Sequence, residues 1–66
     1  MQVRINGEPQ TWLRGTSLAD AVAALTTANS GVAAALNGEV VRRAAWASTQ
    51  LQDGDQVEVL TAVQGG

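Results

Sequence analysis

The end of the chain carries the most conspicuous chemical group in this sequence. The last three residues are Gln64, Gly65 and Gly66, and we expect a free α-carboxylate on Gly66. Glycines lack a Cβ atom and can pass through a narrow channel, and three fully extended residues span roughly 10 Å. An α-carboxylate is ionised at neutral pH, so it could attack the α-phosphorus of ATP in another protein's active site and become an acyl-adenylate. A chain that works in this way needs no catalytic side chain of its own.

The composition agrees with such a passive role. The 66 residues include no Cys, His, Lys, Tyr or Phe, and all four basic residues are arginine. The usual nucleophiles, general bases and zinc ligands are therefore almost entirely missing. We expect no enzyme activity, no catalytic residue, no metal site and no cofactor bound by the chain itself.

Charge and hydropathy narrow the partners. The formal net charge of −2 argues against a nucleic-acid-binding face, which requires clustered basic residues. No apolar run approaches the roughly 20 residues that span a bilayer, and the N-terminus lacks the layout of a signal peptide. We expect a cytoplasmic protein that binds neither nucleic acid nor membranes.

The length allows one domain with a small core. Residues 1–63 are predicted to form it, and residues 64–66 are predicted to be a flexible tail. Hydrophobic periodicity indicates an α+β fold, a mixed sheet of four to five strands with one main helix on one face. The predicted strands are residues 1–5, 8–13, 32–36, 40–41 and 56–63, and the predicted helix is residues 18–28.

Local signals set the ends of these elements. Ser17 and Asp20 have the spacing of a capping box at the helix start, and the run from Asn29 to Gly31 predicts a helix end near Ala28. Pro9 lacks an N–H group, which favours an edge strand for residues 8–13. Trp46 is expected to anchor an irregular segment after residue 41.

The sequence Asn-Gly-Glu occurs twice, at residues 6–8 and 37–39. Asn-Gly between extended segments is the strongest short signal for a type I′ hairpin, because both central residues need a positive φ. We interpret both occurrences as turn chemistry and nothing more.

Two surface features have a functional and a structural interpretation. Leu60 and Ala62 lie on the strand face opposite the predicted core, where they form either an apolar docking patch or a surface that a loop covers. Arg42 and Arg43 either contact an anionic group on a partner or are simply solvated.

The whole chain resembles the small sulfur carriers of bacterial thiamine biosynthesis, which are ubiquitin-like β-grasp proteins. The resemblance rests on these motifs: Val3-x-Ile5-Asn6-Gly7-Glu8, Ser17-Leu18-x-x-x-Val22-x-x-Leu25, Val32-Ala33-x-Ala35-Leu36-Asn37-Gly38-Glu39-Val40-Val41, Arg43-x-x-Trp46, Leu51-x-Asp53-Gly54-Asp55-x-Val57-Glu58 and Ala62-Val63-Gln64-Gly65-Gly66. Arg42 departs from the family, which usually has proline there.

The resemblance implies a cycle of reactions on Gly66. An adenylyltransferase related to ubiquitin-activating enzymes would activate its carboxylate with ATP and magnesium. A persulfide donor would then convert it to a thiocarboxylate, and thiazole synthase would receive the sulfur. Gln64 and Gly65 would form the tail, and partner docking is expected of Leu60, Ala62, Glu58 and Arg43.

Other functions remain open from the sequence. The small subunit of molybdopterin synthase and a sulfur carrier for cysteine synthesis would share the fold and the two terminal glycines. A protein-conjugating modifier would use Gly66 for isopeptide bonds, and a non-covalent adaptor would not use it at all.

Overall fold

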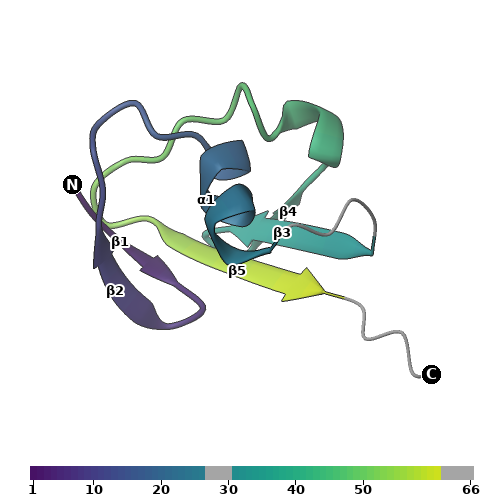
Figure 1. Cartoon of the computed structure of the whole chain (residues 1–66), viewed down its shortest axis with the longest axis horizontal. Coiled ribbons are helices and arrows are strands. Elements are labelled where there is room, and N and C mark those ends of the chain that lie inside the picture. Colours follow the sequence, from purple (N-terminus) through teal and green to yellow (C-terminus); the bar gives the residue numbers. More distant parts are fainter. Residues whose placement is uncertain (27–30, 62–66) are drawn as a thin grey trace.

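The computed structural model describes residues 1–26 and 31–61 and shows an α+β fold with one mixed sheet (Figure 1). The elements are β1 (Gln2–Ile5), β2 (Glu8–Thr11), α1 (Leu18–Leu25), β3 (Val32–Leu36), β4 (Glu39–Val41), the 3-10 helix η1 (Arg43–Ala45) and β5 (Gln56–Thr61). The strand order is β2-β1-β5-β3-β4. β1 and β5 are parallel, and the other neighbouring strands are antiparallel. The predicted fold class is confirmed, with five strands.

The first hairpin has the predicted turn. Asn6 and Gly7 have φ angles of 51° and 84°, as a type I′ turn requires. Met1 and Trp12 face each other and exchange backbone hydrogen bonds of 2.8 and 2.9 Å. β2 lies at the sheet edge, as predicted from Pro9. At an edge, the missing backbone N–H of proline does not interrupt the hydrogen bonds between the interior strands.

The helix α1 begins as predicted but ends earlier. Ser17 Oγ accepts a hydrogen bond from the Asp20 backbone N–H, and the Asp20 carboxylate accepts one from the Ser17 N–H, which completes the capping box. The prediction that α1 extends to about Ala28 is wrong, because Leu25 is its last residue and Thr26 is extended at φ −153°. Thr is β-branched and favours extended backbone, and this preference ends the helix one turn early. Ala28 itself lies outside the described residues.

The core lies between the sheet and the layer formed by α1 and η1 (Figure 1). Its buried members come from every layer: Val3, Ile5, Leu18, Ala21, Val22, Ala34, Trp46, Leu51, Val57 and Val59. Trp46 is the anchor that the sequence predicts, since its ring is buried directly after η1. Leu25, the last residue of α1, is 44% exposed.

The two Asn-Gly turns do more than reverse the chain. Asn37 and Gly38 repeat the positive φ angles of the first turn, at 51° and 85°. In both turns the asparagine side chain also hydrogen-bonds to the backbone of β5, at Val59 from Asn6 and at Gln56 from Asn37. The interpretation of these repeats as turn chemistry alone is therefore wrong.

Candidate functional site

The strand β5 carries two of the predicted docking residues. Val57 and Val59 point into the core, whereas Glu58 and Leu60 point to the opposite face of the sheet and are exposed. Leu60 is 69% exposed, so among the described residues no loop covers it. The sequence left two possibilities for Leu60, an open apolar surface or a surface that a loop covers. For the described residues the structure confirms the open surface. Thr61, the last residue of β5, is also exposed.

Leu60 belongs to an apolar surface that crosses three strands. The register places Ala33 of β3 beside Leu60 and places Ala35 between Glu58 and Val40 of β4. Val40 is 80% exposed and Ala33 is also exposed. We call Leu60, Ala33, Ala35 and Val40 the outer-face strip. A contiguous exposed apolar surface of this kind is typical of a site that binds another protein.

A shallow hollow lies where β5 ends. It is lined by Gly31, Val32, Ala33, Leu60 and Thr61. The outer-face strip therefore leads to the point where the chain continues towards its last residues.

The predicted tail and one docking residue lie beyond this point. Ala62, Gln64, Gly65 and Gly66 are outside the described residues, so their assigned roles stay predictions. Five residues follow Thr61, and a fully extended segment of that length would reach at most about 18 Å.

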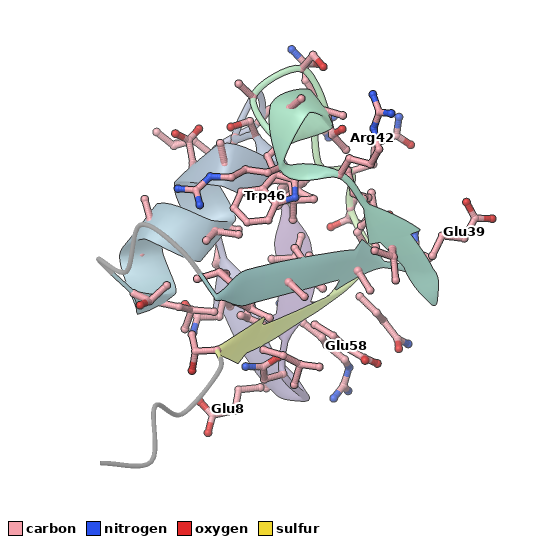
Figure 2. The ribbon with its side chains drawn as sticks, turned by 90° about the vertical axis from the view of Figure 1, so that its right-hand side faces the viewer. Glu8, Glu39, Arg42, Trp46 and Glu58 are labelled. Atoms are coloured by element: carbon pink, nitrogen blue, oxygen red, sulfur yellow. The ribbon has the colours of Figure 1, made fainter. Side chains whose placement is uncertain are left out.

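Arg43 does not join the outer-face strip. Its guanidinium carbon lies 5.6 Å from the centre of the Trp46 ring, a cation–π arrangement in the layer that covers the core. Figure 2 shows Trp46 and Glu58 on opposite sides of the sheet. The structure thus brings Leu60 and Glu58 together on one face and places Arg43 on the other side.

Arg42, where the family usually has proline, precedes η1 in an extended conformation. Its φ of −65° and ψ of 144° are the angles that proline itself adopts. The backbone at Arg42 therefore has the conformation that suits proline, although the residue is arginine.

The sequence analysis missed two residues that hydrogen-bond to β5, one near the tail and one at the opposite end of the strand. Asn6 and Asn37 hold the two ends of β5 through their side chains. The available signal was the repetition of Asn-Gly-Glu, because glycine would satisfy the same turn angles without the side chain. A second asparagine at the equivalent position indicates that the amide itself has a use.

The described residues contain no group of three or more His, Cys, Asp or Glu side chains that could hold a metal ion. Nor does any helix formed by these residues have the length and apolar character needed to cross a bilayer.

Comparisons with known proteins identify the relatives of this chain. The profile of the ThiS family matches residues 3–66. The sulfur carrier protein ThiS of Escherichia coli is 30% identical over 66 residues, which cover 100% of both chains. A thiazole synthase of Magnetococcus marinus is 36% identical over 66 residues, which are the whole of this chain but 20% of that protein. The chain thus spans about a fifth of that relative's length.

Two solved structures share the fold over the whole chain. The crystal structure of a thiamine biosynthesis protein (ThiS) from Geobacter metallireducens has a TM-score of 0.74 and 37% identity, with 100% of both chains covered. A solution structure of a thiamine biosynthesis protein from the same organism has a TM-score of 0.77 and 38% identity, and the match covers 88% of that chain.

Proposed function

The chain belongs to the ThiS family, and on this premise we propose that it carries sulfur to thiazole synthesis as a thiocarboxylate on Gly66. The observation that carries the proposal is the extent of the family match, which runs through Gly65 and Gly66 to the last residue. As a member of this family the chain is a small sulfur carrier and not a catalyst. Its partners perform the chemistry on its end.

The first step is the activation of Gly66. A carboxylate oxygen attacks the α-phosphorus of ATP in an adenylyltransferase, the bond to pyrophosphate breaks, and an acyl-adenylate forms. Magnesium and ATP belong to that partner. The composition supports this division, because a chain without Cys, His or Lys offers few side chains that compete with the terminal carboxylate.

The second step replaces oxygen by sulfur. The terminal sulfur of a persulfide donor attacks the acyl carbon, and AMP leaves. A thiol then attacks the sulfur–sulfur bond of the acyl persulfide, so that a disulfide forms and the thiocarboxylate of Gly66 is released. Thiazole synthase is the proposed acceptor. Support comes from the Magnetococcus relative, where a segment similar to this whole chain forms part of a thiazole synthase.

The outer-face strip is the proposed docking surface for these partners. Leu60 of β5 and Val40 of β4 expose apolar area on the two strands that flank β3, and burial of that area offsets the entropy lost when the tail becomes ordered. Glu58 lies within this face and supplies a charge that can select partners. Ala62, the first residue beyond Thr61, would continue the surface towards the tail.

The experiment removes the reactive end. The chain without Gly65 and Gly66 is compared with the full chain in an adenylation assay that measures pyrophosphate released by the adenylyltransferase. The full chain is expected to support release and the shortened chain to support none, while both have the same melting temperature. A control in which Gln64→Ala leaves both glycines in place is expected to keep most of the activity. Release that persists without Gly66 would refute the proposal.

A further inference from the structure

The side chain of Asn6 replaces one rung of the sheet. β1 bonds to β5 through the Arg4 N–H to the Asp55 oxygen at 2.9 Å and the Asn6 N–H to the Val57 oxygen at 2.8 Å. The next rung would lie at Val59, but the backbone has turned away at Gly7. Asn6 Oδ1 accepts a hydrogen bond from the Val59 N–H at 2.8 Å, and Asn6 Nδ2 donates one to the Val59 oxygen at 3.2 Å.

This rung lies close to the tail. Within the described residues, Val59 is the last residue of β5 that hydrogen-bonds to the β1 side. Beyond it Leu60 and Thr61 are paired with β3 alone, through Ala33 and Val32. The C-terminal end of β5 is therefore fixed on one side by pairing with β3 and on the other side by the side-chain amide of Asn6.

Asn37 makes a similar clamp at the opposite end of β5. Its Oδ1 accepts a hydrogen bond from the Gln56 N–H at 3.0 Å, and its backbone N–H donates one to the Gln56 oxygen at 2.8 Å. The two asparagines have the same φ of 51° and each is followed by a glycine. They differ in their distance along β5 from the tail and in their second side-chain bond, which Asn37 Nδ2 donates to the Asp55 carboxylate at 3.0 Å.

We propose that Asn6 is a positioning residue for the reaction at Gly66, because its clamp on Val59 fixes the end of β5 from which the tail enters the partner's active site. This inference rests on the proposed function. A strand end that is already fixed loses less conformational entropy when the partner binds. Without the clamp, the strand end must lose this conformational entropy when the partner binds. Loss of the clamp therefore weakens binding of the carrier and leaves the rate of the chemical step unchanged.

The test compares Asn6→Gly with Asn37→Gly. Glycine keeps the positive φ of each turn and removes the side-chain clamp. For each variant the melting temperature is measured, and adenylation is followed by pyrophosphate release at saturating ATP with the carrier as the varied substrate. The KM of Asn6→Gly is expected to rise about 5- to 30-fold with an unchanged kcat, since the variant lacks the two hydrogen bonds that order the end of β5 before binding. The KM of Asn37→Gly is expected to stay near that of the natural chain.

A milder variant, Asn6→Asp, tests the same role if Asn6→Gly does not fold. Asn6→Asp tolerates the same turn and keeps the acceptor for the Val59 N–H, but its ionised carboxylate has no proton for the Val59 oxygen. Its KM is expected to lie between those of the natural chain and Asn6→Gly.

The possible outcomes separate the two claims. Equal KM values for the Asn6 and Asn37 variants, or a lower kcat with an unchanged KM, would overturn the positioning role. If the natural chain is itself not adenylated, the proposed function fails first.

Discussion

The indole N–H of Trp46 donates a 2.8 Å hydrogen bond to the carbonyl oxygen of Val41 and thereby fastens η1 to the end of β4. The Trp46 ring is buried in the core, and the guanidinium of Arg43 lies over it. One side chain thus joins the last residue of the β4 edge strand to the layer that covers the sheet. Val40 of the outer-face strip directly precedes Val41 on the same short strand.

Trp46→Phe is expected to destabilise the fold. The change removes the bond to Val41 and part of the buried ring, so we expect a loss of about 1–3 kcal/mol in the free energy of unfolding. Urea denaturation measures it. The matched control is Trp12→Phe, because the Trp12 indole is half-buried and donates only to Gln10 two residues away, at 3.3 Å. Similar losses for both tryptophans would contradict the anchoring role of Trp46.

Leu60→Gln is expected to weaken docking without harming the fold. Leu60 is exposed, so its replacement should change the unfolding free energy by less than about 0.5 kcal/mol. If Leu60 is the centre of the interface, the Kd for the adenylyltransferase should rise about 10-fold or more, as measured by titration calorimetry.

Leu13→Gln provides the control for docking. Leu13 is 84% exposed, but it follows β2 near the start of β1, at the other end of the sheet from Leu60. Its replacement should leave the Kd unchanged. An unaltered Kd for the Leu60 variant would exclude the outer-face strip as the docking surface.

Arg42→Pro is expected to stabilise the chain. The backbone of Arg42 already has a φ of −65°, and the preceding residue Val41 lies in a strand, which is the conformation favoured before proline. Proline reduces the freedom of the unfolded chain, so the unfolding free energy should increase by about 0.4–1 kcal/mol. Thermal and urea denaturation measure this gain. Arg42→Ala controls for the lost charge, and a proline variant no more stable than the alanine variant would contradict the argument.

The strands and turns of this fold were predictable because their signals are local. The Asn-Gly pairs fix two hairpins through their φ angles, and alternation fixes which side of β5 is buried. The exposure of Leu60 followed from that alternation. The end of α1 was placed too late because the weak extended preference of Thr26 was outweighed by the stronger termination signal from Asn29 to Gly31.

The clamp of Asn6 could not be predicted in the same way. Asn6 and Val59 are 53 residues apart, and their contact depends on β1 and β5 being parallel neighbours. The position of Arg43 could not be predicted either. Arg43 follows β4 closely in sequence, but this does not tell on which side of the sheet η1 lies. Long-range packing decides both placements.

The central claim is that Gly66 carries sulfur as a thiocarboxylate, and the intact mass of the natural protein from thiamine-starved cells tests it most directly. We predict a fraction of the chain that ends at Gly66 and is heavier by the exchange of one oxygen for sulfur, and we predict that this fraction disappears when Gly66 is deleted. A chain found only with an unmodified end under starvation, or found joined through Gly66 to lysines of other proteins, would contradict the account.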